Sequence, residues 1–100
     1  MKMIFKKDTK NNNEIIAFMP YEFWDWQGNF TCYAHIGQHS ACCYAYYLQC
    51  KPATYQEYKP LLEELKSIGY DVQVINRING KLFSQCYQDF LAKAGMGRRA

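Results

Sequence analysis

Short apolar segments separated by polar residues occupy much of the first third of the chain and predict β-strands. The apolar segments 3–5 and 14–19 flank the polar residues 8–13. They predict a hairpin, or a short arm that pairs with the first main strand. Pro20 is expected to end that strand, because its nitrogen carries no hydrogen to donate to a neighbouring strand. The chain is therefore expected to begin with β-structure.

A further strand is predicted over residues 30–36, where apolar and polar side chains alternate cleanly. Successive side chains of a strand point to opposite faces, so we expect one face to be buried and the other open. Residues 37–40 are expected to form the turn that follows. Residues 41–49 are ambiguous, because their cysteines and tyrosines favour a strand whereas Ser40 would cap a short helix. We predict the strand.

Helical spacing of apolar residues predicts a helix over residues 54–67. Thr54 and Glu57 have the spacing of a capping box, in which each side chain bonds the backbone amide of the other residue. Gly69 is expected to end the helix in the left-handed conformation. Pro60 is expected to kink the helix or to delay its regular part. The apolar stripe comprises Tyr58, Leu61, Leu62, Leu65 and Ile68.

Residues 71–78 predict a last strand, and the Asn79-Gly80 pair after it is a strong turn signal. Apolar residues then recur at helical spacing from Leu82 to a stop at Gly95. This order of elements predicts an α+β fold, with a mostly antiparallel sheet of three to four strands and two helices packed on it. The expected core residues include Leu61, Leu65, Phe90 and Leu91.

The composition is typical of a single globular domain spanning residues 1–100, with 49% hydrophobic and 21% charged residues. A chain this short can bury one modest core. No segment approaches the roughly 20 apolar residues of a membrane span, and no apolar segment typical of a signal peptide follows the N-terminal lysines. Five cysteines without an export signal are typical of reduced thiols. We therefore expect a cytoplasmic protein with no membrane partner.

The net charge of +3 is concentrated at the two ends of the chain. The basic residues at these ends are Lys2, Lys6, Lys7, Lys10, Arg98 and Arg99. Basic ends can contact nucleic acid, but short basic tails are more often solvated. Nucleic acid is therefore a weaker candidate partner than a protein, and the charge pattern leaves the oligomeric state open.

Four residues of the types that bind zinc lie close together in the sequence: Cys32, His35, His39 and Cys42. On the predicted strand, however, Cys32 and His35 would point to opposite faces. Structural zinc sites also usually join two pairs of ligands across a longer loop. We therefore expect no metal and no cofactor.

The same cysteines and histidines could supply a nucleophile and a base. No third residue that would orient the base is apparent, and the sequence has no phosphate-binding or paired-carboxylate motif. We therefore predict a protein that is not an enzyme. The alternative function is binding of a small ligand or zinc in a pocket lined by Tyr33, His35 and His39.

Residues 21–27 contain four large aromatic side chains and two acidic ones, and they are expected to cross the surface as a connection. The tryptophans could simply cover the sheet. Tryptophan beside acidic residues is also typical of protein interfaces. Because one modest core cannot bury every aromatic ring, we expect Trp24 or Trp26 to be exposed and to anchor a partner. Glu22 and Asp25 would then set the charge preference at the rim.

Three segments carry a resemblance to a known family: residues 32–40 (CYAHIGQHS), 51–54 (KPAT) with Glu57 and Tyr58, and 67–70 (SIGY). Over about residues 14–78 the chain resembles a family of small proteins encoded by phages and mobile elements of gut bacteria. The resemblance leaves the C-terminal helix outside and implies no catalytic residues. It implies an inhibitor of host defence, a class that includes anti-CRISPR proteins. It also makes residues 37–39 a shared structural or contact element.

These observations together predict a non-enzymatic binding protein of phage or mobile-element origin that acts in the cytoplasm of the host bacterium. It would inhibit a host protein, such as a component of CRISPR–Cas defence, by surface contact. The expected contact residues are Trp24, Trp26, Glu22, Asp25, Tyr33, His35, Gln38 and His39.

Overall fold

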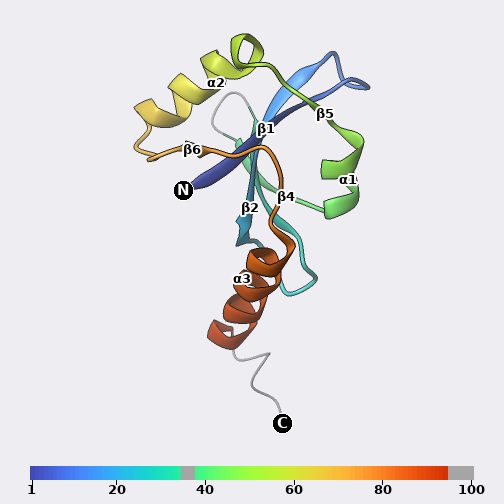
Figure 1. Ribbon diagram of the computed structural model, residues 1–100, viewed down its shortest axis with the longest axis vertical. Coiled ribbons are helices and arrows are strands. Elements are labelled where there is room, and N and C mark those ends of the chain that lie inside the picture. The colour runs from blue at the N-terminus through green and yellow to red at the C-terminus, as the bar shows by residue number, and fades with distance from the viewer. Residues whose placement is uncertain (35–37, 95–100) are drawn as a thin grey trace.

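An antiparallel β-sheet with helices around it forms the protein in the computed structural model, which describes residues 1–34 and 38–94 (Figure 1). The strands are β1 (Lys2–Asp8), β2 (Glu14–Phe23), β3 (Phe30–Ala34), β4 (Gln38–Cys42), β5 (Lys51–Pro52) and β6 (Gln73–Val74). The helices are α1 (Tyr44–Gln49), α2 (Tyr55–Ser67) and α3 (Gly80–Lys93). The strand order is β4-β3-β2-β1-β5 with antiparallel neighbours, and β6 pairs parallel with β1.

The predicted α+β class and the largely antiparallel sheet are confirmed. The predicted numbers of elements were too low, because the described part of the chain holds six strands and three helices. Among these residues no helix combines the length and the apolar character that crossing a membrane requires.

The predicted N-terminal hairpin is confirmed by the antiparallel pairing of β1 with β2. The paired register runs from Ile4 opposite Phe18 to Asp8 opposite Glu14. Asn12 and Asn13 form the turn with positive φ angles of 55° and 56°, a conformation that asparagine tolerates better than most residues. The polar segment between the two strands thus acts as the predicted turn.

Pro20 does not end β2, which continues to Phe23. The register between β2 and β3 shifts between Met19, which pairs with Thr31, and Phe23, which pairs with Phe30. Bulges of this kind interrupt the regular hydrogen bonding of a sheet and are among the places where a strand accepts proline. The prediction was wrong because Pro20 lies where the register shifts, so its lack of an N–H donor does not break a regular hydrogen-bonded pair.

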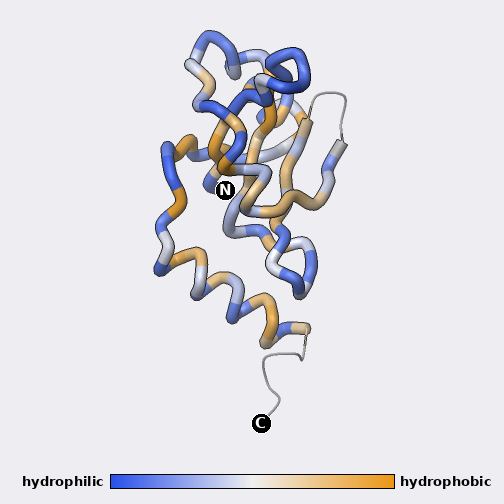
Figure 2. Tube along the Cα trace, turned by 90° about the vertical axis from the view of Figure 1, so that its right-hand side faces the viewer, coloured by the Kyte–Doolittle hydropathy of each residue, from blue (hydrophilic) through white to orange (hydrophobic). Residues whose placement is uncertain are grey.

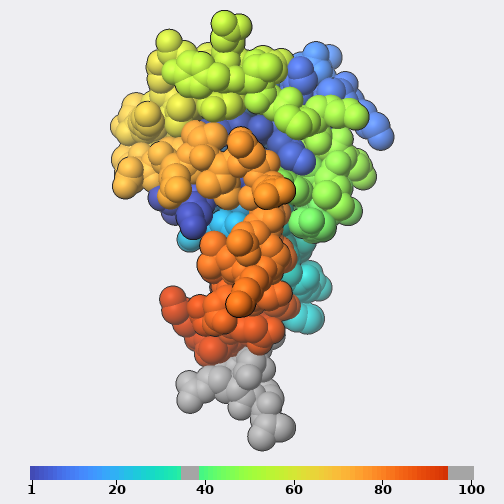
Figure 3. All heavy atoms as spheres, in the orientation of Figure 1, coloured from blue at the N-terminus to red at the C-terminus, as the bar shows by residue number. Residues whose placement is uncertain are grey.

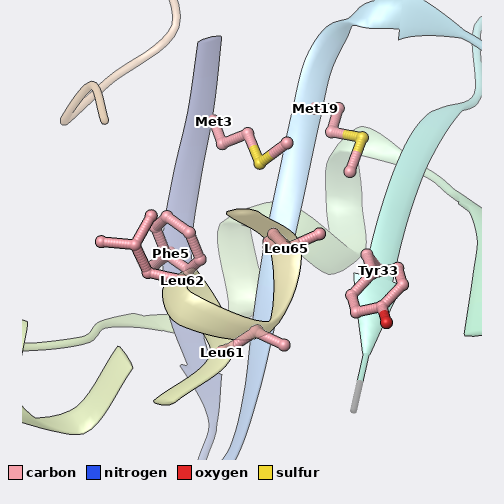
Figure 4. Packing of buried hydrophobic residues seen from close by; sticks show 8 residues of the cluster. Met3, Phe5, Met19, Tyr33, Leu61, Leu62 and Leu65 are labelled. Atoms are coloured by element: carbon pink, nitrogen blue, oxygen red, sulfur yellow. The ribbon is translucent and has the colours of Figure 1, made fainter. Parts of the chain in front are cut away.

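Both faces of the sheet are covered, so the prediction of a half-buried strand over residues 30–36 was wrong. Cys32 and Tyr33 point to opposite faces of β3, yet both are buried. One face packs against α2, where side chains of the sheet converge on three leucines of that helix (Figure 4). This cluster comprises Met3, Phe5, Ala17, Met19, Tyr33, Leu61, Leu62 and Leu65.

The second core cluster lies on the opposite face of the sheet and includes residues of α1. It comprises Ile4, Ile16, Phe18, Phe30, Cys32, Cys42, Tyr47 and Cys50. Figure 2 shows apolar positions concentrated along the strands, and apolar and polar positions alternating along α3. The sheet therefore separates two small cores.

Helix α2 begins and ends as its sequence predicts. The Thr54 hydroxyl accepts from the Glu57 amide at 3.3 Å, and the Glu57 carboxylate accepts from the Thr54 amide at 2.8 Å. Gly69 follows the helix with a φ of 110°. Pro60 lies inside the helix without delaying its start, which is at Tyr55. The capping box determines where the helix begins.

The segment between β3 and α2 differs from its prediction. Residues 38–42 form β4 rather than completing a turn, and Gly37 lies outside the described residues. Residues 44–49 form α1 instead of a strand. Cys43 caps this helix in place of Ser40, because its sulfur accepts from the Tyr46 amide at 3.4 Å. Packing of Tyr47 on the sheet outweighs the β-propensity of the segment.

The Asn79-Gly80 pair begins α3 instead of forming a hairpin turn, because the Asn79 side chain accepts from the Leu82 amide at 3.0 Å. The predicted strand over 71–78 is reduced to the two residues of β6. Of the predicted core residues, the two in α2 are buried, whereas Phe90 and Leu91 are only half-buried. Helix α3 packs at one end of the sheet and is partly open to solvent (Figure 3).

Leu65 offers a test of the core beneath α2. Its side chain is 0% exposed, so Leu65→Ala should lower the free energy of unfolding by roughly 2–5 kcal/mol through lost burial and the cavity left behind. Leu48→Ala, on the exposed face of α1, is the control and should change it by less than about 0.5 kcal/mol. Urea titration measures both values. Equal losses would contradict the assigned packing.

Glu57 offers a test of the capping box through pH. Hydrogen bonds from Lys7, at 2.8 Å, and from the Thr54 amide lower the pKa of Glu57 from 4.5 to about 2. A carboxyl group whose pKa is lower in the folded protein stabilises the folded state at pH values above its pKa in the unfolded chain. This contribution is lost as the pH falls from about 4.5 to about 2.

Urea titrations at several pH values should therefore show Glu57→Gln less stable than the wild type at pH 7. The two proteins should converge as the pH falls towards 2. Glu63→Gln is the control, since the Lys59–Glu63 pair is exposed and 4.0 Å apart. A constant difference between wild type and Glu57→Gln at all pH values would contradict the role of this carboxylate.

Candidate functional site

The connection between β2 and β3 is a tight turn, residues 24–29, which we call the tryptophan turn. The Asp25 carboxylate accepts from the Gln27 amide at 3.0 Å, and from the amide and side chain of Asn29 at 3.2 and 2.9 Å. The Trp24 amide donates to the Asn29 carbonyl at 2.8 Å. Gly28 has a φ of 91°, which favours glycine. The turn thus has a backbone held by its own hydrogen bonds.

Asp25 has a structural role in this turn. Hydrogen bonding by the Asn29 side chain, followed by the backbone amides of Asn29 and Gln27, lowers the pKa of Asp25. Its carboxylate orders the turn, and its contact with a partner at the rim stays a prediction. Short polar side chains that bond the backbone two residues ahead are typical of turns, and this signal was present in the sequence.

Both tryptophans of this turn are exposed, Trp24 by 49% and Trp26 by 56%. The prediction that at least one of them is substantially exposed is confirmed. The Tyr87 hydroxyl of α3 donates to the Trp26 carbonyl and joins the turn to that helix. The tryptophan turn lies beside α3, at the end of the molecule away from α2 (Figure 3). Two large apolar rings are thus displayed from an ordered backbone.

A hollow of about 260 Å³ lies between α3 and the end of β2, close to the tryptophan turn. Its lining consists of Tyr21, Glu22, Phe23, Cys86, Asp89, Phe90 and Lys93. Burial, followed by the negative charges of Asp89 and Glu22, raises the pKa of the Cys86 thiol. The lining of the hollow therefore combines aromatic side chains with two carboxylates and one lysine. Sequence reasoning missed it, because the residues come from segments about 60 positions apart.

Tyr33 is a core residue, although the sequence suggested a contact role. It is 1% exposed, and its hydroxyl donates to the Glu64 carboxylate of α2. His39 on β4 is exposed, with its Nε2 2.6 Å from the Tyr70 hydroxyl. Its ring contacts Tyr33 edge-on at 4.8 Å between centroids. The two residues are thus neighbours, with polar atoms engaged within the protein.

The other predicted contact residues are divided between two places. Glu22 is exposed and lies near the tryptophan turn, whereas His39 lies near α2 and Tyr70. Gln38 is paired opposite Ala34 in β4. His35 lies outside the described residues. The predicted residues therefore do not form one continuous site.

The candidate zinc ligands also separate. Cys32 and Cys42 belong to the core cluster on the α1 side of the sheet, whereas His39 contacts Tyr33 on the α2 side. Within the ranges that the structure describes, no group of three histidine, cysteine or acidic residues is placed to hold a metal. The expectation that the protein holds no zinc stays a prediction.

Comparison of the chain with protein-family models, with curated proteins and with solved structures finds no match. The most distinctive surface feature of the chain is the tryptophan turn with the adjoining acidic hollow.

Tyr33→Phe tests whether this residue is structural. Loss of the hydroxyl removes a hydrogen bond to a carboxylate and should lower the free energy of unfolding by roughly 1–2 kcal/mol. His39→Ala, at an exposed position, should change it by less than about 0.5 kcal/mol. Thermal and urea unfolding measure both. A larger loss from His39→Ala than from Tyr33→Phe would contradict the assignment.

Proposed function

We propose that this chain is a non-enzymatic binding protein that contacts another protein through the tryptophan turn. The observation that carries the proposal is the exposure of both Trp24 and Trp26 on a turn that Asp25 already orders. Tryptophan is the residue type most enriched among the strongest contacts of protein interfaces. Because the backbone is ordered before binding, the complex loses less conformational entropy when it forms.

The surroundings of the turn indicate the chemistry of the partner surface. The nearby hollow offers apolar contact with Phe23 and Phe90, and the carboxylates in its lining, Glu22 and Asp89, outnumber its single lysine, Lys93. Complementary charge increases the rate of association and selects among partners. The partner should therefore present an apolar pocket for an indole ring with lysine or arginine beside it.

The proposed class of partner rests on the family that residues 14–78 resemble. Small proteins of phages and mobile elements often inhibit host defence, so we propose that the partner is a defence protein of the host bacterium. Inhibition would follow from coverage of a working surface of that protein, in the bacterial cytoplasm. A component of a CRISPR–Cas system is one member of this class.

Tryptophan substitutions test the proposed interface. The partner is first identified by affinity capture from infected host cells with mass spectrometry, and is then purified for calorimetric titration. Trp24→Ala or Trp26→Ala should weaken its binding about 30-fold, or roughly 2 kcal/mol, as expected for a central interface residue. Because both indoles are exposed, the urea midpoint should remain close to that of the wild type.

Tyr55→Ala is the matched control, since this aromatic residue is 55% exposed and begins α2, which lies at the opposite end of the molecule from α3 (Figure 1). It should leave the affinity unchanged. Glu22→Lys should slow association and weaken its dependence on salt. If both tryptophan variants bind the partner normally and Tyr55→Ala loses affinity for it, the interface lies on α2 and the proposal is overturned.

A further inference from the structure

Two cysteines lie together on the α1 side of the sheet, on the neighbouring strands β3 and β4. Cys32 is opposite Ser40 and Cys42 is opposite Phe30, so the two cysteines are diagonal neighbours on one face. The Cys42 thiol, whose sulfur also lies 3.7 Å from the Cys43 carbonyl oxygen, is a neighbouring donor that lowers the pKa of Cys32. The Ser40 hydroxyl lies 3.3 Å from the Cys32 sulfur. Cys32 is therefore surrounded by two potential donors.

Both cysteines line a hollow of about 310 Å³ on this side of the sheet, although each is only 6% exposed. Glu14, Ser40 and Tyr46 contribute further polar groups to its lining. The hollow is open towards solvent, so a small molecule can approach the two sulfurs. Limited exposure makes the site selective for small reagents.

The two thiols are electrostatically unequal. The hydrogen bond from Cys42, assisted by Ser40, lowers the pKa of Cys32 to about 7 despite its burial. The same hydrogen bond, together with burial, raises the pKa of Cys42. Only a thiolate attacks disulfides at a useful rate. Near neutral pH, Cys32 is the nucleophile and Cys42 retains its proton.

We propose that Cys32 and Cys42 form a redox-active dithiol that reacts with small disulfides and closes to an intramolecular disulfide. The Cys32 thiolate attacks one sulfur of the reagent, forming a mixed disulfide and expelling one thiolate. Cys42 then gives up its proton to the thiolate expelled in the first step and attacks the Cys32 sulfur, which expels the second thiolate. The protein loses two electrons and two protons, and the small disulfide is reduced to two thiols.

The strand geometry favours a readily reversible bond. Diagonal neighbours of an antiparallel pair lie farther apart than residues directly opposite, so closure requires a small displacement. Among the described strands β4 is at the edge of the sheet, paired with β3 alone, and can move with few other contacts. A disulfide that holds a strand displaced is more easily reduced than an unstrained one.

The other cysteines serve as internal controls. Cys43 is exposed, but its sulfur accepts from the Tyr46 amide at the start of α1. Burial raises the pKa values of the Cys50 and Cys86 thiols. Cys86 also belongs to α3, in the separate hollow beside the tryptophan turn. The pair is thus distinct from the other thiols, and this inference does not depend on the proposed protein partner.

Exchange with 2-hydroxyethyl disulfide tests the dithiol in the folded, reduced protein. The intact mass of the wild type should fall by two hydrogens, and titration should find two of its five free thiols lost. Dithiothreitol should restore both the mass and the thiols. Trypsin leaves four cysteines in one fragment, because residues 11–50 contain no lysine or arginine. Chymotrypsin, which cleaves after Tyr33 and Tyr44, separates Cys32 from Cys42 and should give a linked pair of peptides.

Variants assign the bond and decide the outcome. Cys32→Ser and Cys42→Ser should abolish closure, with Cys42→Ser stopping at a mixed disulfide, whereas Cys43→Ser and Cys86→Ser should close as the wild type does. No reaction of Cys32 in the wild type, a mixed disulfide that persists on Cys32, or a bond lost in Cys43→Ser would overturn the proposal.

A measurement on the wild type guards against variants that fail to fold. The rate at which iodoacetamide alkylates Cys32 should rise with a midpoint near pH 7. Peptide mapping after brief labelling assigns the modified residue. A rate for Cys32 that rises only above about pH 8.5, as for an ordinary thiol, would remove the nucleophile that the proposal requires.

Discussion

Burial of strand β2 on both faces is the constraint on which the rest of the structure depends. Residues 16–20 are all buried, with successive side chains directed alternately towards α2 and towards α1. A strand of this kind is stable only if both faces are covered, because its apolar side chains would otherwise meet water. The hairpin with β1, the pairing with β3 and the packing of two helices all serve this burial.

The size of the chain limits what this core can cover. Helix α2 covers one face and the short α1 helps to cover the other, while α3 packs at the far end of β2 around Phe23, where its Phe83 also contacts Phe30 of β3. The turn beyond this end therefore lies past the reach of the core, and Trp24 and Trp26 remain in solvent. The surface proposed to bind a partner is thus a geometric consequence of a small core and a long central strand.

Alternation of side chains along the strands places Cys32 and Cys42 on one face of the sheet and His39 on the other. Cys32 falls on the α1 side with Cys42, whereas its neighbour Tyr33 falls on the α2 side with His39. The cluster that looked like a zinc site in the sequence becomes a pair of thiols on one face and an aromatic contact on the other. Adjacent positions in a strand have opposite surroundings, so closeness in sequence is a poor guide to a shared site.

Features that depend on local interactions could be predicted from the sequence. The hairpin turn, the capping box of Thr54 and Glu57, and the stop at Gly69 each involve residues a few positions apart, and all were predictable. Tertiary structure decided the rest. Whether residues 44–49 became helix depended on packing of Tyr47 against the sheet, and burial of Tyr33 depended on α2 crossing above it. Such outcomes arise from contacts between distant segments, and local propensity carries no information about them.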